Sequence, residues 1–150
     1  MRRLIHILFV LLCLSSCKDC YYVENDLHGI WQVMSIEKFP EGKVTEARGQ
    51  LYYMFQRTMV QLGYKPLNSS KSMKHYISHI DFIGQDSLGM GGFRARTTGE
   101  GDYVNKESKI PLDSLRRFGL YNDYTTFYME QSKQNLILIS DSARIVLRRY

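Results

Sequence analysis

Cysteine is scarce in this chain of 150 residues: there are three cysteines, and all of them lie within the first 20 positions. No thiol follows Cys20, so we expect no structural disulfide in the body of the protein. A long apolar run is absent as well. The apolar segment 4–14 is interrupted by His6 and is too short for a transmembrane helix, which needs about 20 residues.

Catalytic signatures are also missing. Gly89, Gly91 and Gly92 lack the spacing, and the strand and helix context, of a phosphate-binding or dinucleotide-binding loop. No serine stands in the Gly-x-Ser-x-Gly pattern of a nucleophile elbow. We therefore expect that the protein is not an enzyme and carries no cofactor.

The excess of positive charge is small. The chain has 20 basic and 15 acidic side chains, and loss of Arg2 and Arg3 with an N-terminal signal would leave 18 against 15, a net charge of +3. The basic residues are dispersed along the sequence, whereas a nucleic-acid-binding surface clusters them on one element. We expect a mildly basic, solvated surface and no nucleic-acid partner.

The first 17 residues have the order of a secretory signal. Arg2 and Arg3 form a basic start, the apolar segment follows, and small residues precede a cysteine. The sequence Leu14-Ser15-Ser16-Cys17 resembles the lipobox of bacterial lipoproteins. This resemblance implies cleavage between Ser16 and Cys17, with palmitate or similar acyl chains on Cys17 that anchor the protein in the outer membrane of the cell envelope. Which face of the membrane carries the protein stays open.

Two other interpretations of this region remain. One is a secretory signal that is cleaved without lipidation. The other is redox chemistry at Cys17-Lys18-Asp19-Cys20, but a thioredoxin-like pair requires a βαβ unit, and no such pattern follows. We expect a signal peptide over residues 1–16, a lipidated tether over 17–27 and one domain over 28–150, which is a common size for a single core.

The pattern from residue 29 onward is typical of β-strands. Segments rich in aromatic and β-branched residues are separated by polar links, and the links 132–134 and 141–142 have the length of hairpin turns. Polar loops are expected over 40–49, 66–72 and 99–109, with a further strand possible within 101–108. The expected strands are 29–36, 50–62, 74–83, 88–98, 125–131, 135–140 and 143–150. The three glycines of 88–98 predict a bulge or a sharp bend in that strand.

One segment departs from this pattern. Residues 111–119 begin with Pro111, end with Gly119 and place apolar side chains at positions 112, 115 and 118, which predicts an amphipathic helix of about two turns. The strands around it form an antiparallel meander. A meander of this length removes its exposed edges by closing into a barrel or by splitting into a β-sandwich, and both folds stay open at this point.

The start of the first expected strand carries a further resemblance. Gly29-Ile30-Trp31 is similar to the Gly-x-Trp opening of lipocalins and of the lipocalin-like domains of bacterial lipoproteins. The resemblance implies an all-β up-and-down barrel of about eight strands with one short helix. It also implies that Trp31 lies at the closed end beneath a ligand cavity, with Arg148 or Arg149 of the last strand across it. The alternative role for Trp31 is that of an ordinary core residue.

The second expected strand offers a candidate cavity wall. By the period of two along a strand, Tyr53, Phe55, Arg57 and Met59 share one face. The apolar members of this set could line a ligand cavity, and Arg57 could hold an anionic group. Core packing is the more frequent use of such aromatic side chains.

A candidate metal site lies on the third expected strand. His75, His79 and Asp81 share one face and are residue types that bind zinc. Same-face neighbours on a strand stand about 7 Å apart, so the three side chains cannot easily meet at one ion. We expect a solvated polar face and no metal.

Two classes of function follow from these observations. The first is a membrane-anchored lipocalin-like protein that binds a small apolar or amphipathic molecule at the cell envelope. The second is an interaction lipoprotein with a solid barrel whose loops contact a protein partner of an envelope complex. A cavity of some hundreds of cubic ångströms would favour the first, and a filled barrel with an exposed apolar patch would favour the second.

Overall fold

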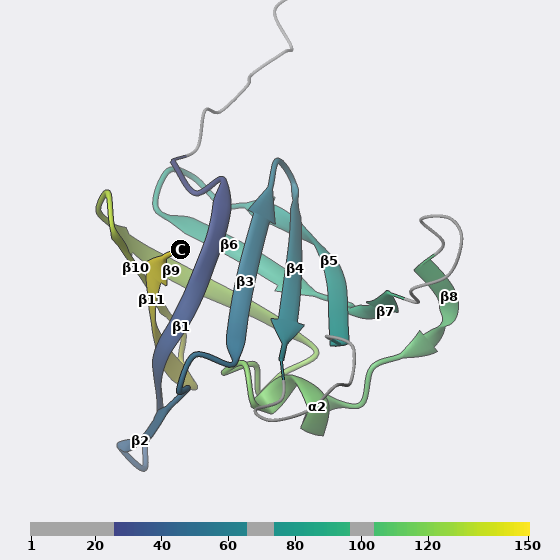
Figure 1. Cartoon of the computed structure of the whole chain (residues 1–150), viewed down its shortest axis with the longest axis horizontal. Coiled ribbons are helices and arrows are strands. Elements are labelled where there is room, and N and C mark those ends of the chain that lie inside the picture. The colour runs from purple at the N-terminus through teal and green to yellow at the C-terminus, as the bar shows by residue number, and fades with distance from the viewer. Residues whose placement is uncertain (1–25, 66–73, 97–103) are drawn as a thin grey trace, which may run out of the picture.

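The structure, a computed structural model, describes residues 26–65, 74–96 and 104–150 of the chain. The expected cleavage site at Ser16 and Cys17 and the expected loop over 66–72 lie outside these residues. Within them the chain is almost entirely β-structure (Figure 1). The elements are β1 (Gly29–Lys38), β2 (Lys43–Glu46), β3 (Leu51–Gln56), β4 (Met59–Tyr64), β5 (Lys74–Phe82), β6 (Ser87–Gly91), β7 (Arg94–Arg96), β8 (Val104–Lys109), α2 (Leu112–Arg116), β9 (Tyr124–Gln131), β10 (Asn135–Ile139) and β11 (Ala143–Arg149).

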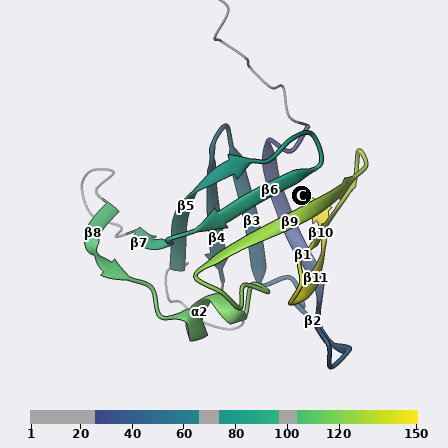
Figure 2. The same cartoon turned by 180° about the vertical axis from the view of Figure 1, so that it is seen from behind.

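Eight of these strands close into an antiparallel barrel. They pair in the order β1–β3–β4–β5–β6–β9–β10–β11, and β11 pairs with β1 to complete the circle. Seen from opposite sides in Figure 1 and Figure 2, the strands surround a common interior. The expected lipocalin-like barrel is confirmed, and the β-sandwich is excluded because each of the eight strands has a partner on both sides.

The barrel follows from the alternation of apolar and polar residues along its strands. In β9, Thr125, Phe127 and Met129 are buried while the residues between them are exposed, because successive side chains on a strand point to opposite faces. The strand β1 changes phase once, at an irregularity between Val33 and Ser35 in its pairing with β11. A β-bulge of this kind bends the strand and lets both halves turn their apolar residues inward.

Two of the expected strands are wrong in their extent. The segment 50–62 forms a hairpin in which β3 and β4 pair on either side of Arg57 and Thr58. Arg57 adopts the left-handed backbone conformation, with φ of 53°, and this reverses the chain although neither residue is typical of hairpin turns. The segment 88–98 divides into β6 and β7 at Gly92, whose φ is 63°.

Short strands also occupy two segments expected as loops. β2 lies within 40–49 and pairs with β1 as an exposed extension of the sheet. β8 lies where a further strand was expected within 101–108, and it pairs with β7, which in turn pairs with β5. Together they bring the described sheet to 11 strands. Since β2, β7 and β8 lie beside the closed circle, they do not change the size of the barrel.

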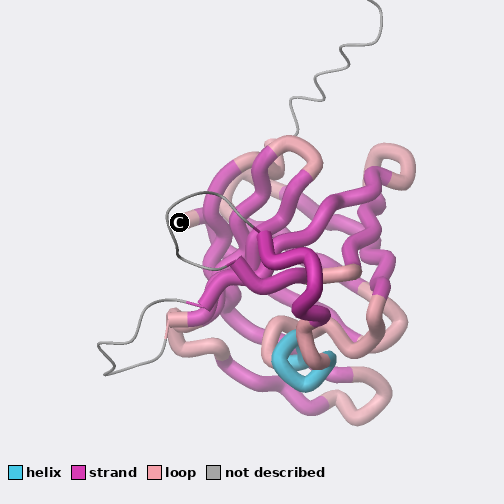
Figure 3. Tube along the Cα trace, turned by 90° about the vertical axis from the view of Figure 1, so that its right-hand side faces the viewer, coloured by secondary structure: helices cyan, strands magenta, loops and turns pink. Residues whose placement is uncertain are grey.

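The two ends of the barrel are covered differently. The end that we call the N-terminal end carries the start of β1 and the β3–β4 and β9–β10 turns, and the chain enters there at the top of Figure 1. The opposite end, which we call the helix end, carries α2 and the link through β2 (Figure 3). A ligand that reaches the interior through the helix end must therefore pass α2 and its neighbours.

The helix end is closed by α2 and the residues that follow it. Leu115, Phe118 and Leu120 belong to the buried core, as the apolar stripe of the expected helix predicts for the first two. Gly119 has φ of 82°, and a Cβ atom at this position would lie 2.8 Å from the side chain of Ile145. Glycine therefore permits both the turn and the close approach to β11. Among the described residues no helix is long and apolar enough to cross a bilayer.

Candidate functional site

The interior of the barrel is the candidate site, and Trp31 forms its floor at the N-terminal end. Trp31 is completely buried and stands opposite Tyr53 of β3 and Arg149 of β11. Its Nε1 donates a hydrogen bond of 2.8 Å to the carbonyl oxygen of Leu27. Leu27 is itself only 2% exposed. Leu27, the last residue of the expected tether, thus packs in the described core and supplies the acceptor that a buried indole N–H requires.

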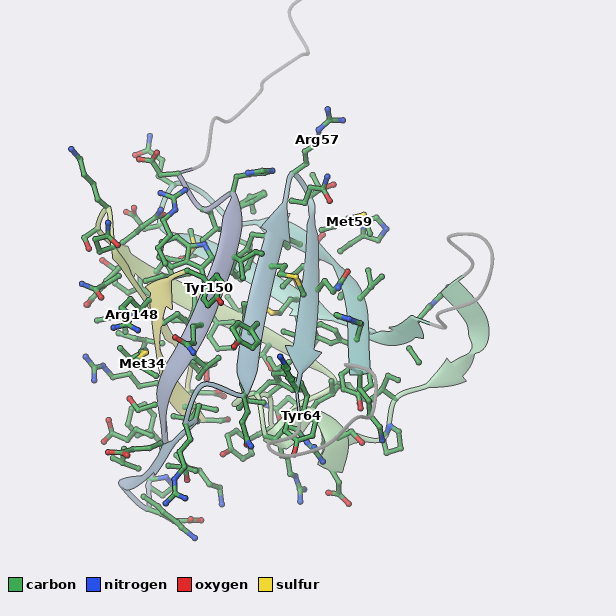
Figure 4. The ribbon with its side chains drawn as sticks, viewed as in Figure 1. Met34, Arg57, Met59, Tyr64, Arg148 and Tyr150 are labelled. Atoms are coloured by element: carbon green, nitrogen blue, oxygen red, sulfur yellow. The ribbon has the colours of Figure 1, made fainter. Side chains whose placement is uncertain are left out.

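Of the two arginines expected near Trp31, Arg149 is the one that reaches the ring. Its guanidinium carbon lies 5.4 Å from the ring centroid of Trp31, and its Nη2 donates a hydrogen bond of 2.9 Å to the carbonyl oxygen of His28. Arg148 lies on the outer face instead, where its Nη2 is 3.5 Å from Oε1 of Gln32 (Figure 4). The two arginines differ because neighbouring residues on β11 point to opposite faces.

The expected cavity wall of four residues is wrong in half of its members. Tyr53 and Phe55 face the interior, and their rings stack with centroids 5.9 Å apart. Arg57 lies exposed in the β3–β4 turn and Met59 is 39% exposed beyond it (Figure 4). The turn ends the alternation on which the expectation was based, so Arg57 lies outside the interior, at the N-terminal end.

Phe118 connects the wall of the barrel to the helix end. The hydroxyl of Tyr53 donates a hydrogen bond of 2.6 Å to the carbonyl oxygen of Phe118. The ring of Phe118 meets those of Tyr53 and Tyr76 edge-on, with centroids 6.3 and 6.0 Å apart. Packed side chains thus run from Trp31 on the floor, through Tyr53, to Phe118. The sequence placed Phe118 on the apolar stripe of a helix, but no local pattern indicated that its ring enters the barrel.

Two cation–π contacts hold the segment around α2 against the rim. The guanidinium carbon of Arg117 lies 4.8 Å from the ring centroid of Tyr64, at the end of β4 (Figure 4), and Nζ of Lys38 lies 5.6 Å from that of Tyr121. At exposed sites such contacts are worth about 0.5–1 kcal/mol each. Four backbone hydrogen bonds of the segment join residues within 111–120, whereas the strands are joined to one another by ladders. The segment is therefore held at this end by its buried side chains, by these two contacts and by its own backbone hydrogen bonds.

The hydroxyl of Tyr53 is the polar link between wall and helix end, and we expect Tyr53→Phe to weaken the fold. Burial raises the pKa of Tyr53 above its ordinary value, so the neutral phenol is the form that donates to Phe118. Its loss leaves a buried carbonyl without this donor, which should lower the free energy of unfolding by about 1–3 kcal/mol. Urea denaturation measures this loss, and the half-exposed Tyr128→Phe is the matched control.

The same phenol should make wild-type stability fall at alkaline pH. Because the folded pKa of Tyr53 is raised above the unfolded value of about 10, its contribution is complete below that pH and is lost as the pH rises further. Tyr53→Phe should show a shallower alkaline loss than Tyr128→Phe. Equal unfolding midpoints and equal alkaline slopes for the two variants would show that the Tyr53 hydroxyl does not help to close the helix end.

Three polar side chains are buried among the described residues: Ser78, Thr125 and Ser140. Ser140 is hydrogen-bonded within the β10–β11 turn, and the hydroxyl of Ser78 donates to the carbonyl oxygen of Gly91. Oγ1 of Thr125 has no hydrogen-bond partner among the described residues. Alternation along the expected strand 125–131 could have placed Thr125 inward, but whether a hydroxyl finds a partner depends on tertiary neighbours.

The three residues considered as metal ligands lie on β5, where His75 and Asp81 contact side chains of other strands. His75, His79 and Asp81 lie on the outward face of the strand. Nδ1 of His75 is 2.7 Å from Nε2 of Gln61, and Asp81 accepts a hydrogen bond of 2.9 Å from the hydroxyl of Tyr124, which raises the pKa of that phenol. Within the described ranges, no three His, Cys, Asp or Glu side chains are placed to hold one metal ion.

Comparisons with known proteins agree with this geometry. A lipocalin-like protein from Bacteroides uniformis ATCC 8492 has a solved structure that superposes with a TM-score of 0.60 at 17% sequence identity. An uncharacterized protein from Bacteroides eggerthii DSM 20697 superposes with a TM-score of 0.60 at 20% identity. Each comparison covers 83% of this chain and 99% of the other. At these identities the likeness establishes the fold, and a comparison with curated proteins found no match.

A family model provides the sequence-level link. The model of a lipocalin-like domain matches residues 12–150. This span includes both the Gly-x-Trp opening at the start of β1 and the whole of β11, the two segments whose pairing closes the barrel over Trp31. By sequence and by architecture, the chain belongs to the family of lipocalin-like domains.

Proposed function

We propose that this protein is a lipoprotein of the cell envelope whose barrel binds a small apolar or amphipathic molecule. The acyl chains on Cys17 would hold it in the outer membrane. The observation that carries the proposal is the closed barrel itself, which has an apolar interior. At the helix end this interior is covered by α2 and its neighbours. A barrel of about eight strands has an interior that side chains fill or that holds one small ligand.

The character of the interior supports an apolar ligand. The inward-facing side chains are almost all aliphatic or aromatic, so a guest must be apolar over most of its surface to replace these contacts. Phe118 is the side chain that a guest arriving from the helix end would displace. Outward movement of the segment that carries Phe118 would break the hydrogen bond from the Tyr53 hydroxyl to the Phe118 carbonyl oxygen, together with the Arg117–Tyr64 and Lys38–Tyr121 contacts. It would leave the ladders that join the eight strands of the barrel closed.

Native mass spectrometry tests the proposal directly. The chain from Cys20 onward contains all of the described residues, including Leu27 of the core and β1, the first strand of the barrel, which begins at Gly29. Purified from its own host, it should carry an added mass that is released as a small molecule on unfolding.

We further expect Phe118→Ala to accelerate the association of the neutral dye N-phenyl-1-naphthylamine, since it removes the ring that closes the helix end. Stopped-flow fluorescence measures the rate. Val44→Ala on β2, at a side chain that is 58% exposed, is the matched control, and both variants must retain the wild-type circular dichroism spectrum. No released molecule, together with equal association rates for the two variants, would contradict ligand binding in the barrel.

One observation favours the second function, contact with a protein partner of an envelope complex. Tyr124 and Tyr128, on the outer face of β9, are 49% and 50% exposed. Exposed tyrosines are enriched at protein interfaces. A co-purified protein in the same mass spectra, without a small molecule, would favour this function.

A further inference from the structure

The interior contains one polar atom for which the described part of the protein offers no partner. Thr125 is 3% exposed and lies on the inward face of β9. Its Oγ1 accepts or donates no hydrogen bond among the described residues. Burying a hydroxyl in this way is costly, and a buried polar group without a partner is rare in native proteins. Position 125 therefore calls for a physical explanation.

The wall around Thr125 is otherwise apolar. Its cross-strand neighbour is Met90 of β6, and the next inward residue on β9 is Phe127; both are 1% exposed or less. Ser78 is the other buried hydroxyl in this region, and it already donates to the carbonyl oxygen of Gly91. The hydroxyl of Thr125 thus lies in an otherwise apolar part of the interior. It is near the start of β9 and so near the helix end.

We propose that Thr125 is the polar anchor of the ligand site, where it forms a hydrogen bond with a neutral hydroxyl or carbonyl group of an otherwise apolar ligand. A threonine hydroxyl both donates and accepts, so it fits either group. Among the described residues no charged side chain is buried in the core, and an ionised ligand group would lack a counter-charge there. The inference rests on the proposed ligand-binding function and narrows the ligand to a neutral amphipathic molecule.

Thr125→Val tests, on the ligand-free protein, whether the Thr125 hydroxyl lacks a hydrogen-bond partner. Valine keeps the shape of the side chain and removes the hydroxyl that has no partner. The melting temperature should therefore rise, by about 2–8 °C for a domain of this size. Thr126→Val is the matched control, because Thr126 is the exposed neighbour on the same strand. It should leave the melting temperature nearly unchanged.

Ligand affinity tests whether the Thr125 hydroxyl forms a hydrogen bond with the ligand. We use n-decanol and n-decane as probes and measure their dissociation constants for the chain from Cys20 onward by titration calorimetry. Thr125→Val should weaken n-decanol binding about tenfold, the effect of one lost hydrogen bond, and should not weaken n-decane binding. Thr125→Ser, which retains the hydroxyl, and Thr126→Val should bind n-decanol as the wild type does.

The outcomes separate this inference from the function on which it rests. If neither probe binds to the wild type, binding of small apolar ligands in the barrel is contradicted, and the anchor with it. If both probes bind but n-decanol has the same affinity for the wild type and for Thr125→Val, the barrel binds ligands and Thr125 is not the anchor. A melting temperature of Thr125→Val below that of Thr126→Val would also overturn the assignment, since it would show that the hydroxyl stabilises the ligand-free fold.

Discussion

Replacement of Trp31 by alanine is expected to lower the free energy of unfolding by about 3–5 kcal/mol, the usual cost of such a large-to-small change in a core. Trp31 is completely buried, and its loss also removes the donor to the carbonyl oxygen of Leu27 and the ring under Arg149. Since domains are stable by only about 5–15 kcal/mol, this variant should be partly unfolded at moderate temperature. Chemical denaturation followed by circular dichroism measures the loss.

The arginines of β11 provide a matched pair for the contact with the ring. Arg149→Ala should cost about 0.5–2 kcal/mol and change the emission of Trp31, the only tryptophan of the chain. Arg148→Ala removes the neighbouring arginine on the outer face, and it should change neither the free energy of unfolding nor the emission of Trp31. Full stability of Trp31→Ala, or identical emission spectra for the two arginine variants, would contradict the floor of the barrel as described.

Replacement of Cys17 by serine is expected to release the protein from the membrane fraction entirely. Each buried methylene of an acyl chain contributes about 0.8 kcal/mol to anchoring, and two chains suffice for stable attachment; serine cannot carry the thioether-linked lipid. The fold should be untouched, because the described core, from Leu27 onward, does not include position 17. Fractionation of cells, with mass spectrometry of the N-terminal peptide, measures both attachment and acylation.

Cys20→Ser is the control for this experiment. It removes the neighbouring thiol, and the variant should stay in the membrane fraction with an acylated N-terminal peptide. Wild-type levels of Cys17→Ser in the membrane fraction would show that another feature of the chain holds it there. The lipoprotein assignment would then be wrong, whereas the barrel and the proposal of ligand binding would be unaffected.

Local sequence patterns were sufficient to predict the class of fold, two of its hairpin turns and its short helix. The turns at 132–134 and 141–142 connect β9, β10 and β11 as expected, because short polar links between alternating segments leave few other conformations. The helix around Leu115 was recognisable from its apolar spacing and its flanking proline and glycine. The pairing of the first and last strands also followed from the lipocalin resemblance at Gly29 and Trp31.

The error in the segment 50–62 arose because the residue types at its turn do not indicate the backbone conformation that they adopt. Arg57 adopts a positive φ in the β3–β4 turn, a conformation that the sequence would suggest for glycine or asparagine. The segment 50–62 therefore looked like one strand, and the wrong phase placed Arg57 and Met59 with Tyr53 and Phe55. A slip of this kind moves every later residue to the other face of the sheet.

The candidate site itself depends on contacts between segments that are distant in the chain. Alternation alone identified Tyr53 as an inward residue, but its hydrogen bond to Phe118 joins positions 65 residues apart. Thr125 also depends on distant segments. Its burial follows from the strand period, but its lack of a hydrogen-bond partner depends on which side chains of β5 and β6 lie beside it. Periodicity determines which face a side chain occupies. Only closure of the barrel brings the faces together, and so only the tertiary structure decides which polar atoms find partners within the protein and which do not.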